Sequence, residues 1–312
     1  MGERGGDVRM RAVRAMLVVN PTSGRGAAAR VAGGVSARLR EAVDRLDVRV
    51  ATDAADTAGT ARRAVDGGCD LLAVLGGDGS AHLAIQACAG SPTALAVIPA
   101  GTGNDLAAAL GMPGAPLAAA AEVAAAIGRG DRPSTLDLGR IDGGTWFSTV
   151  LCAGFDSKVN ERANGMRWPS GPRRYDLAIF VELARLGAYP LTVETEHGTQ
   201  ELRATMVSIG NTPTYGGGLR ICPAADLHDG QFDVTVVGPI SRRRLVRTFP
   251  MLRTGAHVDE PEVSTLRASR VRLAGDNGWV AYADGDRQGD LPLSVTCVPD
   301  AIRVITARPA HG

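Results

Sequence analysis

The stretch from Leu71 to Leu83, LLAVLGGDGSAHL, constrains the fold of this chain more than any other. An apolar run, Leu71 to Leu75, stops at the turn GGDGS, and apolar residues then recur at helical spacing, which predicts a buried strand, a glycine turn and a helix. Glycines let the backbone approach a ligand closely, and the free N–H groups at a helix start favour an anion such as phosphate. Asp78 would then face a metal ion, because a bare carboxylate repels phosphate. For this turn alone, a glycine-rich connection without a ligand is an equally good interpretation.

Two further apolar strands end in turns of the same kind. Residues Ala15–Asn20 run into the turn PTSGRG, and residues Thr93–Ile98 run into PAGTGND. Helical stretches separate the strands, which predicts an α/β domain with a mostly parallel sheet. Ligands of such sheets bind beyond the carboxyl ends of the strands, so we expect all three turns to lie along one edge.

From about Ser134 the pattern changes to strands joined by short connections, interrupted by helical segments at 175–186 and 242–254. This pattern predicts an antiparallel, β-sandwich-like second domain. We therefore divide the chain into an α/β domain at residues 1–133 and a β-rich domain at 134–299, and residues 300–308 could return to the first domain. The expected strands of the second domain are 135–141, 145–151, 191–196, 202–210, 232–238, 263–273 and 279–283.

Composition excludes several classes of protein. A net charge of +1 and an aromatic content of 4% argue against a nucleic-acid partner. Lys158 is the only lysine and no GxxxxGKS or GxxxxGKT motif is present, which excludes the usual P-loop NTPase. Five scattered cysteines without a CxxC motif predict free thiols and a cytoplasmic protein. No apolar run approaches the roughly 20 residues of a spanning helix, and the charged first residues lack the apolar centre of a signal peptide.

Five motifs carry a resemblance to a known family. They are NPTSGRG, GGDGS, PAGTGND, PAADLHDG and DGD, and in this order they cover roughly Ala15 to Thr306. The set resembles the diacylglycerol kinase catalytic-domain family, which includes bacterial soluble lipid kinases and the sphingoid-base kinases. The resemblance implies ATP- and Mg²⁺-dependent transfer of the γ-phosphate to the hydroxyl of diacylglycerol or a related lipid alcohol. It also implies an ATP-binding first domain, a lipid-binding second domain and a cleft between them.

The resemblance also assigns contacts for nucleotide. Thr52 is among these contacts, with a helix N-cap as the alternative for its side chain. The residues expected to contact ATP are Asn20, Pro21, Thr22, Ser23, Gly24, Thr52, Gly76, Gly77, Asp78, Gly79, Ser80, Thr102 and Asn104.

Two Mg²⁺ sites follow from the same resemblance. Asp78 and Asp105 would hold the ion beside the phosphates, partly through water, and a helix cap is the alternative for Asp105. A structural Mg²⁺ would be held by the side chain of Asp229 and the carbonyl oxygens of Asp226 and Gln231. The residues alone indicate a hairpin turn with solvated acids at that second place.

The general base is expected in the motif Asp284-Gly285-Asp286. The family commonly has Asp-Gly-Glu here, and the third residue is its proposed base for the substrate hydroxyl. Asp286 is one methylene shorter than glutamate and would need a backbone shift or a bridging water, so Asp284 is the obvious substitute. His82, on the first turn of the helix after GGDGS, is expected to meet solvent or a capping partner rather than to act in catalysis.

A lipid substrate has to be reached from a membrane surface. Residues 166–175 place three arginines beside two aromatic side chains, and residues 242–247 form a second basic cluster. The first segment fits either weak contact with the inner face of the membrane or a solvated loop, and we expect the second to be a solvated helix face. The sequence leaves a homodimer open.

The sequence also allows two alternative functions. One is a kinase of a soluble acceptor such as NAD, because GGDG also occurs in NAD kinases. The other is a non-catalytic nucleotide- or lipid-binding regulator, because DGD departs from the family pattern.

Overall fold

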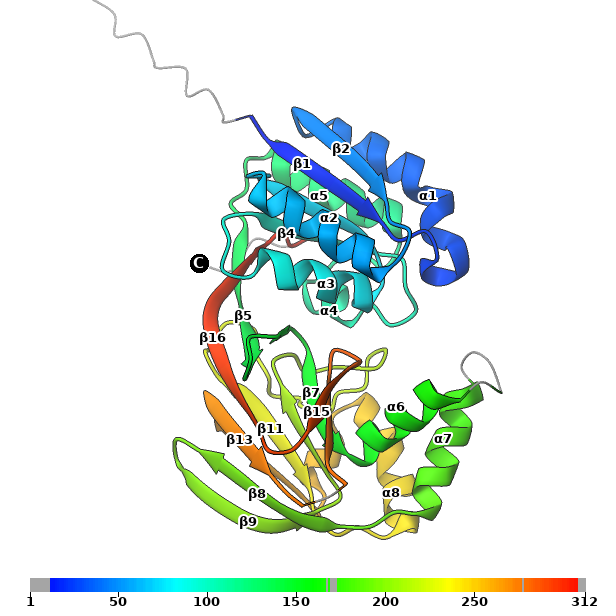
Figure 1. The fold of residues 1–312 in the computed structure, drawn as a ribbon, viewed down its shortest axis with the longest axis vertical. Helices are drawn as coiled ribbons and strands as arrows, with labels where there is room; N and C mark the ends of the chain where they lie inside the picture. Colours follow the sequence, from blue (N-terminus) through cyan, green and yellow to red (C-terminus); the bar gives the residue numbers. More distant parts are fainter. Residues whose placement is uncertain (1–11, 167, 169–172, 277, 308–312) are drawn as a thin grey trace, which may run out of the picture.

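The protein folds into two lobes that lie end to end (Figure 1). The computed structural model describes residues 12–166, 168, 173–276 and 278–307. The first lobe holds a parallel sheet in the order β2-β1-β3-β4, with α2 and α3 packed together on one face and α1 packed with α5 on the other. Its elements are β1 (Arg14–Val19), α1 (Ser23–Arg40), β2 (Arg45–Val50), α2 (Ala54–Asp66), β3 (Leu71–Gly76), α3 (Asp78–Cys88), β4 (Ala94–Pro99), α4 (Asp105–Ala109) and α5 (Pro116–Gly128).

The continuous apolar runs of the sequence form β3 and β4, the buried strands at the centre of this lobe. Every residue of β3 and β4 is buried, as expected for parallel strands covered by helices on both faces. The core of the lobe is built around them from valine, leucine, isoleucine and many alanines.

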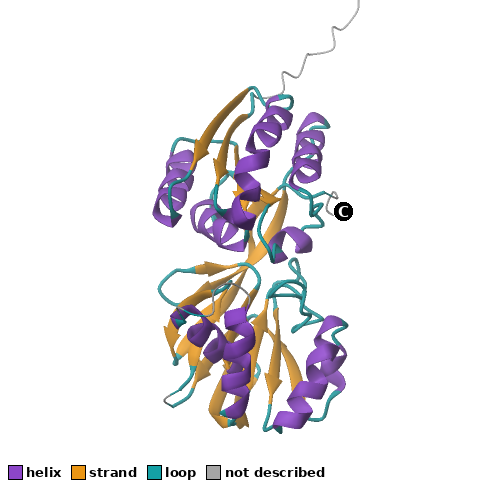
Figure 2. Ribbon diagram, turned by 90° about the vertical axis from the view of Figure 1, so that its right-hand side faces the viewer, coloured by secondary structure: helices purple, strands orange, loops and turns teal. Residues whose placement is uncertain are grey.

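The second lobe packs two sheets against each other. One is an antiparallel sheet in the order β12-β11-β10-β7-β14-β15, and the other contains β5, β6, β8, β9, β13 and the long β16. Three helices, α6, α7 and α8, lie on the same side of this lobe (Figure 2). The strands are β5 (Ser134–Ile141), β6 (Trp146–Phe147), β7 (Val150–Gly154), β8 (Tyr189–Thr195), β9 (Gly198–Ala204), β10 (Met206–Gly210), β11 (Phe232–Val237), β12 (Val263–Ala268), β13 (Arg270–Ala274), β14 (Val280–Ala283), β15 (Asp286–Asp290) and β16 (Leu293–Val304); the helices are α6 (Phe155–Gly165), α7 (Arg173–Ala184), α8 (Arg242–Thr248) and the 3₁₀ turns η1 (Phe249–Arg253) and η2 (Ala256–Asp259).

The strand β16 connects the lobes. Its first residues pair with β13, and residues from Val295 to Val304 pair with β5. Arg303 and Val304 also pair in parallel with Ala94 and Leu95 of β4. One hydrogen-bonded sheet therefore continues from the first lobe into the second, and the end of the described chain returns to the first lobe. The boundary between residues 133 and 134 stays a prediction.

Two expected strands are wrong in one respect. The segments 202–210 and 263–273 each form two strands that belong to different sheets, with the crossings at Thr205 and Ser269. The crossing at Ser269 is held by Glu196, whose carboxylate accepts hydrogen bonds from the backbone N–H and hydroxyl of Ser269 at 2.6 and 2.9 Å. The structure also contains α6 and β15, which the sequence pattern does not predict. A mostly parallel first sheet followed by a sandwich-like antiparallel lobe confirms the expected fold class.

Candidate active site

The turns after β1, β3 and β4 touch one another at one end of the first sheet. A Cβ atom on Gly24 would lie 2.3 Å from the carbonyl oxygen of Ala100, and one on Gly101 would lie 2.6 Å from the Cα of Gly77. Both distances are shorter than packed atoms allow, so glycine is required at Gly24 and Gly101. The structure thus brings the three turns together, as the strand pattern predicts.

Polar side chains fasten the turns to one another. The side-chain amide of Asn20 donates to Oγ of Ser80 at 2.9 Å, which links the first turn to the second. The backbone N–H of Asn104 donates to Oδ2 of Asp78 at 2.7 Å, which links the third turn to the second. Asn104 adopts a left-handed φ of 58°, and its side chain closes the third turn on the backbone of Gly101. Backbone and small side chains thus form the surface expected to hold phosphate.

Thr52 lies in the short connection between β2 and α2. The N-cap of α2 is Asp53, whose side chain accepts from the N–H of Asp56 at 2.8 Å. The alternative interpretation of Thr52 as the cap is therefore wrong, while its contact with nucleotide stays a prediction. Contacts of ATP with the other turn residues are likewise predictions.

Asp78 and Asp105 flank Gly103. A Cβ on Gly103 would lie 2.6 Å from Oδ2 of Asp78 and 3.4 Å from Oδ2 of Asp105, so the two carboxylates face the same point. Burial, and next the charge of Asp105, raise the pKa of Asp78 above its usual value, against the lowering effect of backbone N–H groups from Asn104 to Leu106. Two neighbouring carboxylates of this kind fit Mg²⁺, which commonly takes one or two carboxylates together with phosphate oxygens.

Asp105 has a second set of partners in the other lobe. Its two carboxylate oxygens each accept from the N–H of Gly217 at 3.0 Å, and Oδ1 also accepts from the N–H of Gly218 at 3.0 Å. Its side chain forms no cap on α4, so the helix-cap alternative is wrong. The carboxylate of Asp105 is therefore oriented by a loop that comes from the second lobe.

The loop from Asp226 to Gln231 is held by contacts within the protein. Oδ1 of Asp226 accepts from the N–H of His228 at 3.0 Å, and Asp229 pairs with Arg267 and accepts from the N–H of Gln231. Asp137, buried beneath the loop, accepts from the N–H of Gly230 at 2.7 Å. Across the part of the chain that the structure describes, no three His, Cys, Asp or Glu side chains are grouped for a metal ion. A structural Mg²⁺ at this loop stays a prediction.

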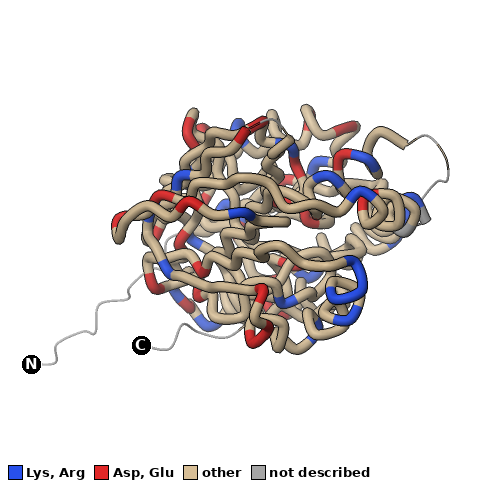
Figure 3. Tube along the Cα trace, turned by 90° about the horizontal axis from the view of Figure 1, so that it is seen from below, with Lys and Arg blue, Asp and Glu red and all other residues tan. Residues whose placement is uncertain are grey.

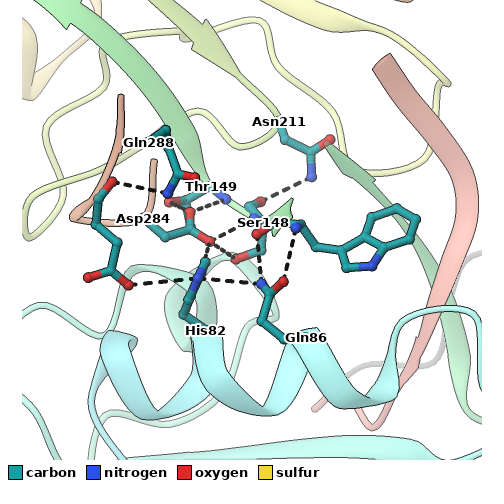
Figure 4. A network of polar contacts seen from close by, with 9 residues as sticks. His82, Gln86, Ser148, Thr149, Asn211, Asp284 and Gln288 are labelled. Carbon is teal, nitrogen blue, oxygen red and sulfur yellow. Dashed lines mark hydrogen bonds and ion pairs between the residues drawn. The ribbon is translucent and has the colours of Figure 1, made fainter. Parts of the chain in front are cut away.

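Asp284 is the centre of a buried polar network (Figure 4). Its carboxylate accepts from the N–H and hydroxyl of Ser148 at 2.8 and 3.2 Å, and from the N–H and hydroxyl of Thr149 at 2.9 and 2.6 Å. A further contact of 3.1 Å joins Oδ2 of Asp284 to Nδ1 of His82. Burial acts to raise the pKa of Asp284, but the hydrogen bond and charge of His82, with the donors from Ser148 and Thr149, hold it below its usual value. Asp284 is thus a fully engaged carboxylate with no oxygen free to serve as a base.

The expectation that His82 meets solvent or a cap is wrong. Its side chain is only 6% exposed, and it connects α3 of the first lobe to Asp284, 202 residues later. His82 stands one helical turn after Asp78, and this spacing is the sequence signal that could have drawn attention to it. Asp286, in contrast, has a side chain that is 63% exposed, and its Oδ2 lies 3.7 Å from Nε2 of His82.

A cavity of about 610 Å³ extends from the three turns into the second lobe. At one end it is lined by Asp78, Thr102 and Asp105, and deeper in by apolar side chains of the six-stranded sheet and of α6, α7 and α8. The apolar lining includes Phe155, Val159, Ile179, Met206, Leu219, Ile221, Val237, Ile240, Leu245, Leu252 and Val263. The sequence pattern predicts the polar end of the cavity but not its apolar wall, because that wall comes from segments scattered over a hundred residues.

One acidic group lies within the apolar part. Asp156 at the start of α6 lines the cavity, and the hydroxyl of Tyr215 donates to its Oδ2 over 3.4 Å. Burial raises the pKa of Asp156 to about 6, against hydrogen bonds that lower it. The cavity therefore offers a polar contact within an otherwise apolar wall.

Comparisons with known proteins agree along the whole chain. Residues 14–141 match the model of the diacylglycerol kinase catalytic domain, and residues 149–306 match the YegS C-terminal NAD kinase beta sandwich-like domain. A diacylglycerol kinase of Mycobacterium tuberculosis (strain H37Rv) is 45% identical over 302 residues, which covers 95% of each chain. A diacylglycerol kinase of Bacillus subtilis is 28% identical and covers 89% of this chain and 91% of its own. A crystal structure of a diacylglycerol kinase from Bacillus anthracis superposes with a TM-score of 0.74 at 19% identity, over 97% of this chain and 99% of the other, and so shares its fold.

Proposed function

Because this chain belongs to the diacylglycerol kinase catalytic-domain family of lipid kinases, we propose that it transfers the γ-phosphate of ATP to the hydroxyl of diacylglycerol or a closely related lipid alcohol. The family and the lipid-kinase activity expected from the motifs are confirmed by the comparisons. One observation carries the choice of acceptor: Asp78 and Thr102, which belong to the turns expected to hold phosphate, also line a largely apolar cavity of about 610 Å³, a volume with room for an acyl chain.

ATP is placed with its phosphates on the three turns. We expect backbone N–H groups of the glycine-rich turns and the hydroxyls of Thr22, Ser23 and Ser80 to contact the phosphates, because none of the three turns contains a lysine. Asp78 and Asp105 would hold Mg²⁺ there. When bound, the ion bridges phosphate oxygens and neutralises charge that develops during transfer.

The acceptor is placed with its hydroxyl at the polar end of the cavity and its acyl chains along the apolar wall. Asp156 and Tyr215 are positioned to contact the polar backbone of the lipid. We assign the role of general base to Asp286, because Asp284 already accepts from Ser148, Thr149 and His82, whereas the carboxylate of Asp286 is exposed. Asp284 serves instead to fix the turn that carries Asp286.

The acceptor enters from a membrane surface in this proposal. In the described residues, no helix has the length and apolar character needed to cross a bilayer. Tyr175 and Phe249 line the cavity and are also 37% and 46% exposed, so the cavity reaches the surface between α7 and η1. Exposed Phe180 and Val246 lie nearby on α7 and α8, and in the view from below basic residues gather on the side of these helices (Figure 3). We propose that this side rests on the inner face of the membrane, with apolar side chains dipping into the headgroup region.

The two basic segments contribute differently to that surface. Residues 167 and 169–172 lie outside the described residues, while Trp168 is 82% exposed. In the second segment, Arg244 pairs with Glu260 and Glu262, and Arg242 donates to the carbonyl oxygen of Ala184. Part of the basic charge of α8 therefore holds the lobe together, and the membrane contact rests more on the exposed aromatic and apolar side chains.

The function is tested by incubating the protein with radiolabelled ATP, Mg²⁺ and a panel of acceptors. The panel contains diacylglycerol, monoacylglycerol, a sphingoid base and ceramide in vesicles, and NAD in solution. Label in diacylglycerol, lost in Asp78→Asn, is the expected result. Label in NAD alone would favour a kinase of a soluble acceptor, and tight ATP binding without transfer to any acceptor would favour a regulator.

A further inference from the structure

The imidazole of His82 lies between the carboxylates of Asp284 and Asp286, which stand two residues apart in the second lobe. Nδ1 is 3.1 Å from Oδ2 of Asp284, and Nε2 is 3.7 Å from Oδ2 of Asp286. Because the carboxylate of Asp284 only accepts hydrogen bonds, Nδ1 carries a proton in this arrangement. The state of Nε2 is then decided by its other neighbours.

Gln86, one turn further along α3, indicates whether Nε2 of His82 carries a proton. Its side-chain oxygen accepts from the backbone N–H of Trp146 at 3.0 Å, and its side-chain nitrogen donates to the carbonyl oxygen of Trp146 at 2.8 Å. These two backbone contacts fix the orientation of the amide, so its NH₂ group is the part that faces Nε2 of His82, at 3.4 Å. An N–H group that faces Nε2 requires a lone pair there. The observed contacts therefore describe a neutral imidazole that can still accept a proton at Nε2.

We propose that His82 is the second member of a proton relay, in which Asp286 takes the proton of the acceptor hydroxyl and passes it to Nε2 of His82. This inference rests on the lipid-kinase reaction proposed above. As the oxygen of the acceptor forms its bond to the γ-phosphorus, the bond from that phosphorus to the bridging oxygen breaks and ADP leaves with the electron pair. The hydroxyl proton moves to the carboxylate of Asp286 and then to Nε2, and it is finally released to solvent.

The geometry explains why two groups are used. His82 is almost fully buried and does not line the cavity, whereas Asp284 and Gly285, on the turn that carries Asp286, do. In the proposal, Asp286 therefore reaches the acceptor from the edge of the cavity, and the imidazole lies behind it. Asp286 is exposed and lies between the imidazole and solvent, but its side chain is short. Transfer of the proton from Asp286 to the buried imidazole would return the carboxylate to its ionised form. No water molecule is then needed on the side that faces the lipid.

Proton transfer would change the partner of Nε2. The neutral imidazole accepts from Gln86, whereas the imidazolium would donate to Asp286 across the present 3.7 Å. The charged groups that act on His82 from the elements packed against α3 are Asp284 and Asp286. Burial acts to lower the pKa of His82, but the hydrogen bond to Asp284 and the charges of both aspartates raise it above its usual value. Proton acceptance is thus favoured by the same two residues that hold the ring.

The relay is tested by the pH dependence of kcat in His82→Gln, which keeps a hydrogen-bond donor but cannot accept a proton. We expect kcat to fall about 10- to 100-fold, less than for loss of the general base itself, with the KM values for ATP and lipid unchanged. We also expect the acid limb, which in the wild type reports the imidazole, to move to the lower pH at which a carboxylate titrates. Gln288→Ala is the matched control, because the Gln288 side chain donates to the backbone carbonyl oxygen of Asp286 without touching the ring, and the variant should keep the wild-type acid limb.

A second measurement does not depend on turnover. In protein labelled with ¹⁵N-histidine, the signals lost in His82→Gln identify the ring. We expect its neutral form to carry the proton on Nδ1. As the pH falls, Nε2 should take up a second proton with a pKa above the 6.5 that is usual for histidine. A neutral ring protonated on Nε2, or an unchanged acid limb in His82→Gln, would overturn the relay. A wild-type protein that phosphorylates no lipid would instead refute the proposed function, whatever the tautomer of His82.

Discussion

The carboxylate of Asp105, at the start of α4, accepts the backbone N–H of Gly217 at 3.0 Å to each of its two oxygens. This contact joins the phosphate side of the first lobe to the loop 215–218 of the second lobe, beside the cavity. A carboxylate that faces Asp78 is therefore also the anchor of a loop in the acceptor lobe. In the proposed function, Asp105 would therefore link binding of the nucleotide to the shape of the acceptor site.

Asp105→Ala should loosen that loop. Hydrogen bonds to a charged group contribute about 1.5–3 kcal/mol, so we expect the amides of Gly217 and Gly218 to exchange with deuterium about 10-fold faster or more. Asp78→Asn is the control, because Asp78 bonds the N–H of Asn104 and not the loop. Unchanged exchange at both glycines in Asp105→Ala would show that the loop is held by other contacts.

The two aspartates of the DGD motif should respond in opposite ways to replacement by asparagine. Asp286→Asn should lower kcat by about 10²–10⁴, with little effect on ATP affinity or thermal stability, because the side chain is exposed. Asp284→Asn should instead lower the free energy of unfolding by about 2–4 kcal/mol, because a buried carboxylate loses its match to several donors. Steady-state kinetics and thermal unfolding of both variants check this. A silent Asp286→Asn beside a stable but inactive Asp284→Asn would mean that Asp284 is the base.

A larger side chain on α7 should narrow the cavity proposed for the lipid acceptor. Ile179 lines the cavity, whereas Leu177 on the same helix is 38% exposed and does not. Ile179→Trp should raise the KM for diacylglycerol about 10-fold, with the KM for ATP unchanged, because the added volume occupies space for the acyl chain. Leu177→Trp is the matched control and should keep the wild-type KM for lipid. An unchanged lipid KM in Ile179→Trp would place the acyl chain elsewhere.

Much of the fold could be predicted because the apolar pattern and the glycine turns are local signals. The strands and turns of the first lobe follow from runs such as Leu71 to Leu75, which end at small polar residues. The crossings at Thr205 and Ser269 could not be predicted, since the apolar pattern continues through both while the strand changes sheet. The sequence does not predict helix α6, because FDSKVNERANG has no clear apolar face.

Part of the candidate site could likewise be predicted from the sequence, and part could not. The phosphate turns are contiguous motifs, and the sequence predicts them together with the pair Asp78 and Asp105. The network of His82 joins residues 202 positions apart, and no local pattern announces such a partner. The structural Mg²⁺ site, the contacts with ATP and a homodimer remain predictions.

The crossing at Ser269 gives a prediction for the pH dependence of stability. Burial acts to raise the pKa of Glu196, but hydrogen bonds from Ser269 and Arg270 lower it to about 2. Since the unfolded value is near 4.5, the contact stabilises the fold fully above pH 4.5, and this stabilisation is lost as the pH falls toward 2. Glu196→Gln should therefore cost about 1 kcal/mol at pH 7, a value reduced for solvent screening of a side chain about one third exposed.

Chemical denaturation at pH 7 and near pH 2.5 checks the effect of Glu196→Gln. The difference in the free energy of unfolding between variant and wild type should shrink at the lower pH. A difference that is the same at both values would exclude the carboxylate as its source.

The central claim is that the three turns meet at one phosphate site, and calorimetric titration of MgATP into Gly101→Ala tests it most directly. A Cβ at this position lies 2.6 Å from Gly77 and forces the second and third turns apart, while Gly114→Ala, with no atom within 4 Å, is the control for an added methyl group in the same lobe. We predict that Gly101→Ala, shown to be folded by its thermal unfolding transition, binds MgATP about 10-fold or more weakly, which is 1.4 kcal/mol, and that Gly114→Ala binds like the wild type. Wild-type affinity in a folded Gly101→Ala would contradict the claim.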